Sequence, residues 1–400
     1  MAAQRTLGAG RLAGFYALFF MATGVALPFL PGYFEASGFS PSQIGVLLAI
    51  GPGCALFMPP IWGQLADRTG RPGLVLAVVS AGAALGYALL ALAPSFLAAF
   101  GALLIQALFS SAISTLIDTL ALHQVGLGGG SYARLRVFGS VGFVISSMGF
   151  GAVVSGYGLA TVLVPLGLMT SAALWAATLL AGAPREEREG PRPTVRAAFG
   201  LLQRREVALF LVATSLHWIA CTPFHGSLAL YVRALGFDPL VVSLSAGLAV
   251  FAEVVVMWTW PRWSASIAPR TLLMAAFAAS SLRWAIMATA ETPLVLISAA
   301  LLHALTFGAF YLAAVAWMAE RTPPSLRATG QALFVAGTFG VGGLVGYVGS
   351  GRVFEALGGA RLFALAAGLE WLPVLVLVAL GSPRPPSEYP TGPARPACQC

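Results

Sequence analysis

The stretch TLIDTLALHQVGLGGGSYARLRVFGSVGF, residues 115–143, joins two apolar runs across a glycine-rich break. Asp118 lies in the first run and Arg136 in the second, each nine residues from Leu127. If the two runs are antiparallel helices, the acid and the base lie at matching depth and can face each other. A charge inside a bilayer costs about 2.5–3.5 kcal/mol, so such residues are usually paired and functional. The alternative is an ion pair that only ties the helix ends together.

The rest of the chain is strongly apolar. Hydrophobic residues make up 58% of the 400 residues and charged residues only 9%, whereas about 25% of a soluble domain is charged. Apolar runs of about 20 residues, long enough to cross a bilayer as a helix, recur along the whole sequence. The sequence therefore predicts an all-α integral membrane protein whose apolar side chains face lipid.

Twelve apolar segments are predicted to be transmembrane helices. They cover residues 11–34, 41–63, 73–93, 95–123, 132–154, 158–182, 206–233, 239–260, 270–290, 293–318, 327–349 and 359–381. The polar segment 184–205 divides them into two pseudo-symmetric six-helix halves, at 1–183 and 206–382, and is expected to be a cytoplasmic linker. Residues 383–400 are rich in proline and are predicted to be a disordered cytoplasmic tail.

The distribution of arginines predicts the orientation. All 22 basic residues are arginines; eighteen fall in the tails and loops on one side, three fall on the other, and Arg283 lies inside a span. Basic residues favour cytoplasmic loops, so both termini are expected in the cytoplasm and the protein in the cell (inner) membrane. The net charge of +8 is therefore not interpreted as a sign of nucleic-acid binding. The four cysteines show neither metal-ligand spacing nor a disulfide pattern, and no metal site is predicted.

Between the second and third spans the chain reads GQLADRTGR, residues 63–71. This loop resembles the signature loop of the major facilitator superfamily, which combines a glycine, an acid and basic residues in a short cytoplasmic turn. The resemblance implies gating residues Gly63, Asp67, Arg68, Gly70 and Arg71. An acid here can cap a helix and pair with arginine, forming a latch that breaks when the cytoplasmic side opens.

Three ionisable residues of the second half are predicted to share one depth. Arg283 and His303 each lie ten residues from Pro293, and Glu253 and Arg283 each lie fifteen residues from Ala268. Antiparallel helices that turn at these points place all three near the middle of the bilayer. Such a group indicates a water-accessible site in which Glu253 or His303 carries a proton. The alternative is a static polar triad that holds three helices together.

The same residues resemble the lactose permease-like branch of that superfamily. The segment YARLRVFGSVGF, residues 132–143, is similar to the start of span five in that branch, where an acid 18 residues earlier joins the arginine in substrate binding. The resemblance implies substrate contacts for Asp118 and Arg136. It also implies that Glu253, Arg283 and His303 couple substrate binding to proton movement.

Differences from that branch favour its phenylpropionate permease relatives. Thr306 and Ala300 stand where lactose-type permeases have a carboxylate and a lysine, and Phe143 replaces the tryptophan on which a sugar ring stacks. The aromatic first span (Phe15, Tyr16, Phe19, Phe20) and the segments 302–308 (LHALTFG) and 328–331 (ATGQ) fit the phenylpropionate branch better.

The sequence thus predicts a proton-coupled symporter that imports a small organic solute by alternating access, with 3-phenylpropionate as the best candidate. The predicted substrate-binding residues are Asp118, Arg136, Phe143 and Arg283, and the predicted proton-coupling residues are Glu253 and His303. The proton gradient replaces a cofactor, since the chain has no GxxxxGK[ST] loop, and no nucleophile–base cluster suggests an enzyme. The alternatives are a sugar or nucleoside symporter, a multidrug exporter, and a receptor or scaffold that does not transport.

Three further polar residues lie inside predicted spans. His217 and His225 could line the cavity or could be packing histidines, and Glu370 is interpreted as a member of a structural pair or as a protonated acid. The sequence leaves these alternatives open.

Overall fold

The computed structural model describes residues 8–126, 132–158, 164–179, 195–263 and 266–380. In the first part of the chain the helices are α1 (Ala9–Ala36), α2 (Pro41–Ala55), α3 (Met58–Thr69), α4 (Pro72–Ala91), α5 (Phe96–Ser110), α6 (Ile113–Gly126), α7 (Tyr132–Tyr157) and α8 (Val164–Leu179). The second part begins with α9 (Val195–Leu202), α10 (Arg205–Ala234), α11 (Leu240–Trp263), α12 (Pro269–Ala288) and α13 (Pro293–Ala300). It continues with the π-helix η3 (Ala304–Ala309), α14 (Phe310–Arg321), the 3₁₀ turn η4 (Pro324–Leu326), α15 (Arg327–Val335), the π-helix η5 (Ala336–Val341), α16 (Gly342–Leu357), α17 (Gly359–Leu369) and α18 (Trp371–Ala379).

The predicted all-α membrane architecture is confirmed. In the described ranges, eleven continuous or nearly continuous helical stretches are long and apolar enough to cross a membrane. The shorter α8, with its apolar core at Gly167–Ala176, lies where the sixth span is predicted. The protein is therefore a multi-pass membrane protein.

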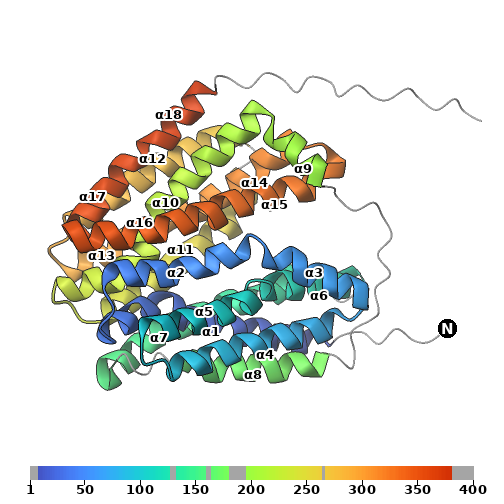
Figure 1. The fold of residues 1–400 in the computed structure, drawn as a ribbon. Helices are drawn as coiled ribbons and strands as arrows, with labels where there is room; N and C mark the ends of the chain where they lie inside the picture. The colour runs from blue at the N-terminus through green and yellow to red at the C-terminus, as the bar shows by residue number, and fades with distance from the viewer. Residues whose placement is uncertain (1–7, 127–131, 159–163, 180–194, 264–265, 381–400) are drawn as a thin grey trace, which may run out of the picture.

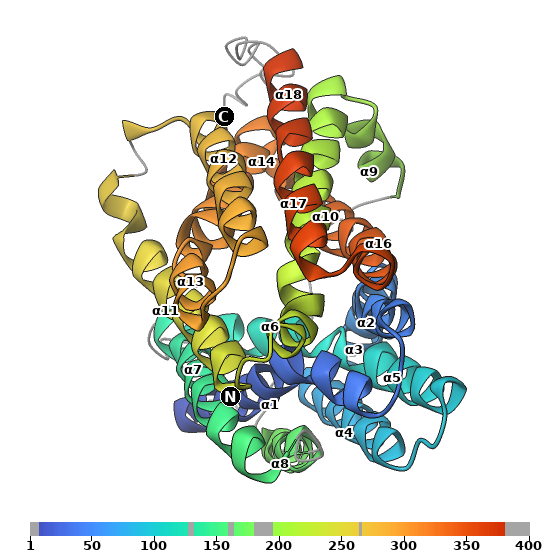
Figure 2. The ribbon, with the colours of Figure 1, turned by 90° about the vertical axis from the view of Figure 1, so that its left-hand side faces the viewer.

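The helices form two groups, with α1–α8 below and most of α9–α18 above in Figure 1. The groups meet mainly where α16 packs on α2 and α11 packs on α7. Figure 2 shows the same contact from the side, with α2 beside α16. Residues 184–194 of the predicted linker, the glycine-rich break at 127–130 and the predicted tail at 383–400 lie outside the described residues, so the domain boundaries remain predictions.

Several predicted spans contain an interruption in the α-helix. The second span is divided at Leu56–Phe57 into α2 and α3, the fourth between α5 and α6, and the twelfth at Glu370. The tenth and eleventh contain the π-helices η3 and η5. Because π-helical turns are rare and often mark functional sites, these two segments are places where a functional site is expected.

The two groups approach each other closely at the end of the molecule where α1 ends, called here the distal end. Gly45 of α2 faces Gly351 of α16, and a Cβ on either would lie only 3.0–3.1 Å from the Cα of the other. Small residues allow membrane helices this close an approach. The glycine-rich eleventh span therefore serves as a contact surface between the two groups.

Polar contacts between the groups also lie at the distal end. Glu355 of α16 accepts hydrogen bonds from the Ser42 backbone N–H at 2.9 Å and the Ser40 hydroxyl at 3.1 Å, at the start of α2. A carboxylate is favourable at a helix N-terminus because of the helix dipole. A third contact joins Arg233 of α10 to Glu35 of α1 at 3.6 Å; it is partly exposed and adds little energy.

Asp238, in the loop before α11, accepts a hydrogen bond from Ser155 of α7 at 2.7 Å. The Leu240 backbone N–H and the Ser155 hydroxyl lower the pKa of the Asp238 carboxyl. A lowered pKa means that this contact is complete at neutral pH and is lost only when the pH falls far enough to protonate Asp238.

Replacing Gly351 by Ala should separate the two groups at the distal end, because the new methyl group would overlap the backbone of α2. Overpacking costs about 1–3 kcal/mol, which shifts a conformational equilibrium roughly 5- to 150-fold. The measurement is the distance between spin labels on cysteines introduced at the exposed Ser37 and Arg352.

Gly349→Ala is the matched control on the same helix, since nothing lies within 4 Å of a Cβ at Gly349. The label distance should lengthen in Gly351→Ala alone. Equal distances in the two variants would show that the glycine contact does not hold the distal end closed.

Candidate functional site

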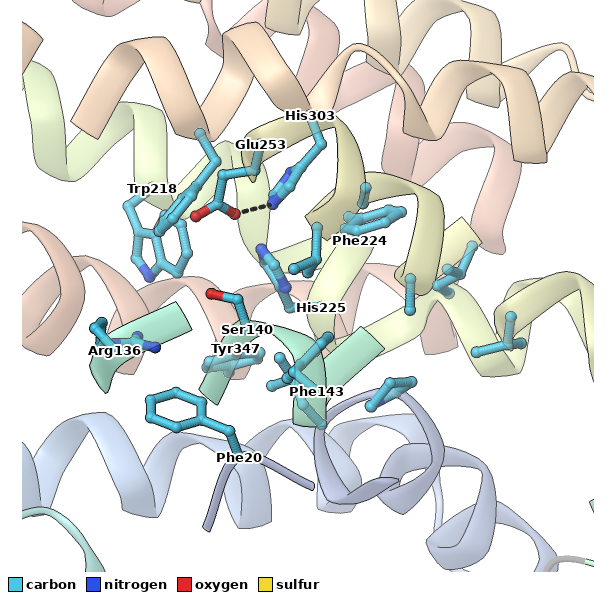
Figure 3. A pocket seen from close by; sticks show the side chains of 18 residues that line it. Phe20, Arg136, Ser140, Phe143, Trp218, Phe224, His225, Glu253, His303 and Tyr347 are labelled. Carbon is cyan, nitrogen blue, oxygen red and sulfur yellow. Dashed lines mark ion pairs between the residues drawn. The ribbon is translucent and has the colours of Figure 1, made fainter. Parts of the chain in front are cut away.

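A cavity of about 300 Å³ lies between the two groups of helices. Its walls come from α1, α7, α10, α11, α16 and the segment around η3, so both groups contribute (Figure 3). Most of the lining is apolar or aromatic, as is usual for small-molecule sites. The polar or charged lining side chains are Arg136, Ser140, Trp218, His225, Glu253, His303 and Tyr347.

Helical spacing explains how these side chains reach one cavity. Arg136, Ser140 and Phe143 follow each other at intervals of four and three residues on α7, which places them on one face of the helix. On α10, Trp218 and His225 are seven residues apart and share a face in the same way. The cavity is therefore built from single faces of several membrane-spanning helices.

Arg136 is the cationic group of the first helix group at the cavity. Its guanidinium carbon lies 4.1 Å from the ring centroid of Phe20, a cation–π contact. Its buried Nη1 atom has no hydrogen-bond partner among the described residues. Gly139 makes room for this arrangement, since a Cβ there would lie 2.8 Å from Nη1 and 2.7 Å from the Phe20 ring.

Asp118 is not part of the cavity wall, and the structure shows no ion pair between it and Arg136 within the described ranges. Its Oδ1 atom instead accepts a hydrogen bond of 2.5 Å from the hydroxyl of Tyr16 on α1. The Tyr16 ring also lies 5.9 Å from the Arg136 guanidinium carbon. The two residues share the predicted depth, but Tyr16 is the hydrogen-bond partner of the acid.

The second group contributes a connected chain of polar side chains. Glu253 on α11 lies 3.7 Å from Nε2 of His303, as the dashed line in Figure 3 shows. Nη1 of Arg283 lies 3.1 Å from Nδ1 of His303 and donates to the Thr306 hydroxyl at 2.9 Å. The three residues that the spacing placed at one depth therefore lie together. Arg283 itself is buried behind the cavity wall, against the rings of Phe224 and Trp284.

The donors in this chain determine the tautomer of His303. A guanidinium can only donate, so Nδ1 of His303 must accept from Arg283 and its hydrogen must be on Nε2. That N–H points toward Glu253. While Nδ1 of His303 accepts from Arg283, it cannot also carry a proton, so His303 is neutral in this arrangement.

The π-helix η3 directs two neighbouring residues to different partners. Phe307 reaches the cavity, whereas Thr306 contacts Arg283. Gly308 in the same turn lies against Glu253, and a Cβ there would be 3.3 Å from the Glu253 Cγ. The wider turn thus brings α11 and the tenth span close together at the polar chain.

The predicted gating loop is mostly helical. Gly63, Asp67 and Arg68 lie in α3, which continues to Thr69, so the turn itself is only Gly70 and Arg71. Gly70 ends the helix in the left-handed conformation, with φ 61°, which a glycine adopts easily. The role of these residues as a latch remains a prediction.

Three of the polar lining residues are not among the site residues predicted from the sequence. They are Trp218, Ser140 and Tyr347. His225, for which the sequence leaves both a cavity and a packing role open, lines the cavity with its ring 5.9 Å from that of His303. The seven-residue spacing of Trp218 and His225 is a signal that could have found this face of α10.

Replacing Tyr16 by Phe should destabilise the protein, because Asp118 loses a hydrogen bond to its partly buried carboxylate. Hydrogen bonds to charged groups contribute about 1.5–3 kcal/mol. Chemical unfolding in detergent micelles measures the loss, and a cycle with Asp118→Asn isolates the pair. Additive effects of the two changes would mean that the hydroxyl and the carboxylate do not interact.

Comparison with known proteins identifies the family. The model of the MFS_1 like family matches residues 10–365. The maltose permease of Geobacillus stearothermophilus is 29% identical over 371 residues, which cover 91% of this chain and 93% of the relative. The "Probable 3-phenylpropionic acid transporter" of Escherichia coli (strain K12) is 26% identical over 380 residues, with coverage of 91% and 93%.

The solved structure of the nucleoside transporter NupG has the same fold, with a TM-score of 0.84 over 94% of this chain and 99% of that chain, at 20% identity. The resemblance to the major facilitator superfamily is thereby confirmed, and the expectation that the protein is not an enzyme holds. The chain belongs to the MFS_1 like family of membrane transporters.

Proposed function

We propose that this transporter is a proton-coupled symporter that imports a small aromatic carboxylate, with 3-phenylpropionate as the best candidate. The observation that carries the proposal is Arg136, a half-buried arginine at an aromatic cavity whose buried Nη1 atom has no hydrogen-bond partner among the described residues. A carboxylate would supply the missing acceptor and form charge-assisted hydrogen bonds. The name of the Escherichia coli relative supports the same substrate class.

Arg136 suits this role better than Arg283. Arg283 also has donors without a partner, Nε and Nη2, but it does not line the cavity. Its Nη1 atom already contacts His303 and Thr306. The aromatic ring of the substrate would pack among Phe143, Phe224 and Trp218, which line the same space. Asp118 would act indirectly, since it holds Tyr16 beside Arg136.

Glu253 is the proposed proton carrier. It lines the cavity, and its side chain is 17% exposed. His303 directs its Nε2–H toward the carboxylate and so stabilises the charged form. Proton binding at Glu253 would weaken this contact to the tenth span, which links protonation to the positions of the helices.

The arginine distribution supports cytoplasmic termini and a cell (inner) membrane location. In that orientation the distal end faces away from the cytoplasm. The distal contacts of Gly45, Glu355 and Asp238 then correspond to a state that is closed on the outside. Opening this end while the cytoplasmic end closes, with the Asp67–Arg68 segment as part of the inner latch, would complete alternating access.

Substrate binding is tested by uptake of radiolabelled phenylpropionate into proteoliposomes. Arg136→Gln should raise the KM at least about 30-fold, because loss of one partner of a hydrogen-bonded charge pair costs about 2–5 kcal/mol. Arg134→Gln is the matched control, since Arg134 is an exposed arginine on the same helix. No saturable uptake by the wild type would reject the aromatic acid.

Proton coupling is tested by Glu253→Gln under an inward proton gradient. Accumulation should disappear, because the amide cannot bind the proton, while exchange of labelled for unlabelled substrate continues. Accumulation that persists in this variant would exclude Glu253 as the carrier. Absence of exchange in the wild type for every substrate offered would instead favour a receptor or scaffold.

A nucleoside is the second candidate substrate. The similarity to the nucleoside transporter NupG extends over nearly the whole chain, and the aromatic walls that suit a phenyl ring also suit a base. Competition separates the two: excess uridine or adenosine should leave phenylpropionate uptake unchanged. Strong inhibition by a nucleoside would assign the cavity to that class.

A further inference from the structure

The ring of Phe224 lies between the cavity and a buried arginine. Phe224 lines the cavity and is 6% exposed, and Figure 3 shows it near His225 and His303. The guanidinium carbon of Arg283 lies 4.1 Å from the centroid of the Phe224 ring, and Arg283 itself does not line the cavity. The ring therefore covers a cationic group that would otherwise be close to the bound solute.

Helical spacing explains the position of Phe224 on α10. His217, Cys221 and Phe224 follow each other at intervals of four and three residues, so they share one face of the helix. His217 and Cys221 are buried on this face and do not line the cavity. Trp218 and His225, each one residue further along, do line it. Phe224 thus lies at the edge of the two faces and contacts both the cavity and the buried side chains.

Arg283 has more donors than the neighbouring acceptors use. Its Nη1 atom contacts His303 and donates to the hydroxyl of Thr306. Its Nε and Nη2 atoms are buried and have no hydrogen-bond partner among the described residues. A guanidinium carries five N–H donors, and a buried donor without an acceptor costs free energy. Arg283 is therefore able to bind a further acceptor that reaches it.

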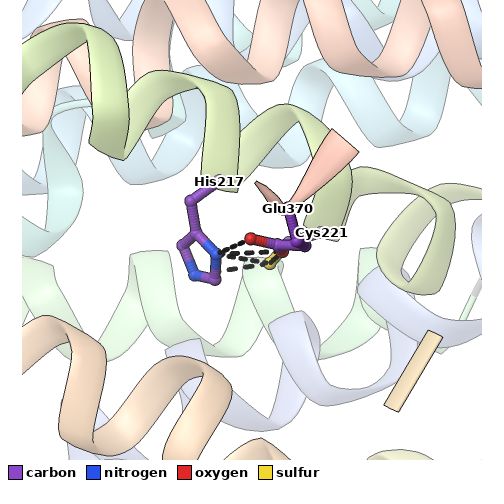
Figure 4. Close-up of side chains that lie close together, drawn as sticks. All are labelled: His217, Cys221 and Glu370. Atoms are coloured by element: carbon purple, nitrogen blue, oxygen red, sulfur yellow. Dashed lines mark hydrogen bonds and ion pairs between the residues drawn. The ribbon is translucent and has the colours of Figure 1, made fainter. Parts of the chain in front are cut away.

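The nearby buried carboxylate of Glu370 is held by other groups. Nδ1 of His217 lies 2.9 Å and 3.0 Å from its two oxygens (Figure 4), and Trp284 donates to one of them at 3.2 Å. Nε2 of His217 lies 3.0 Å from the backbone oxygen of Thr306, which can only accept, so Nε2 carries a hydrogen. Nδ1 and the carboxylate then share a second proton, and the pair is neutral overall. It supplies no counter-charge to Arg283.

The charges at the cavity do not by themselves exclude a dicarboxylate. Arg136 and Glu253 line the cavity, and Arg283 lies behind Phe224. These three side chains carry two positive charges and, when Glu253 is ionised, one negative charge. One substrate carboxylate then makes the total zero, and two carboxylates make it zero when Glu253 holds a proton. The second carboxylate would have to reach Arg283, however, and the Phe224 ring is in the way.

We propose that Phe224 restricts the substrate to aromatic acids with a single carboxylate, because it separates Arg283 from the cavity. The proposal rests on the proposed function, in which Arg136 binds the substrate carboxylate. A second carboxylate on the substrate ring would meet the Phe224 ring instead of a cation, and an ionised carboxylate that leaves water without a partner is costly. With a short side chain at position 224, that carboxylate reaches the free donors of Arg283 and forms charge-assisted hydrogen bonds.

The test is isothermal titration calorimetry of purified protein with 3-phenylpropionate, 3-(3-carboxyphenyl)propionate and 3-(4-carboxyphenyl)propionate. The wild type should bind phenylpropionate at least about 10-fold more tightly than either dicarboxylate, because the second carboxylate has no cationic partner. In Phe224→Ala the ratio of dissociation constants should shift toward at least one dicarboxylate by about 10-fold or more, the effect of a hydrogen bond to a charged group.

Three controls separate a gained charge contact from a lost ring. Phe143→Ala removes a cavity ring from α7 and should weaken the binding of all three acids without changing the ratio. Phe224→Leu keeps an apolar cover over Arg283 and should keep the ratio of the wild type. The methyl esters of the ring carboxyl groups fill the same space without the charge, so they should not gain affinity in Phe224→Ala.

The addition of Arg283→Gln to Phe224→Ala should remove the gain for the dicarboxylate. A gain that persists in this folded double variant would assign the contact to another cavity donor, such as His225 or Trp218, and would overturn the proposal. An equal gain for the esters, which reports only added space, would also overturn it. The ester comparison uses Phe224→Ala alone, so it decides the question even if the double variant does not fold.

The two proposals fail separately. If the wild type does not bind phenylpropionate, the proposed substrate class fails, yet a dicarboxylate that binds only to Phe224→Ala would still show that the ring covers Arg283. If the wild type binds phenylpropionate and folded Phe224→Ala shows the same ratio as the wild type, the substrate class stands and the role of Phe224 fails. Equal affinities of the wild type for phenylpropionate and a dicarboxylate would also overturn that role.

Discussion

A guanidinium buried among membrane-spanning helices imposes the strongest constraint on this structure. Arg283 is 1% exposed, so neighbouring helices must stabilise its charge, although its Nε and Nη2 atoms have no hydrogen-bond partner among the described residues. Phe224 and Trp284 cover it with aromatic rings, and His303 and Thr306 accept from one of its nitrogens. Because these partners come from α10, α12 and the tenth span, one residue ties three helices together at the depth of the cavity.

The cavity depends on these contacts of Arg283 in the second helix group and on a different set of side-chain contacts in the first helix group. In the second group, neutral His303 presents a donor to Glu253 because Arg283 occupies its other nitrogen. In the first group, Tyr16 stands between Asp118 and Arg136, which leaves a guanidinium nitrogen at the cavity without a partner. The two sides of the cavity thus differ chemically: one presents a guanidinium donor, and the other presents a carboxylate beside a neutral histidine.

Several features could be predicted from the sequence because they depend on local order along the chain. Long apolar runs, their proline and glycine interruptions and the depth of charged residues follow from the rise of a helix and from the energy of burying charge. Glu253, Arg283 and His303 therefore meet as their spacing indicates. Phe143 and Arg136 reach the cavity for the same reason, since they share a face of α7.

The sequence by itself determined the fold class, the family and the depth of the ionisable groups. Only the tertiary structure decided which of them meet. Equal depth does not specify the rotation of a helix about its axis, so the sequence could not show that Tyr16, more than a hundred residues away, takes the Asp118 hydrogen bond, or that Glu370 reaches His217. The periodicity of apolar residues in the sequence also does not predict the π-helical turn, which lets Thr306 contact both Arg283 and His217. Side-chain packing between distant segments settles these contacts.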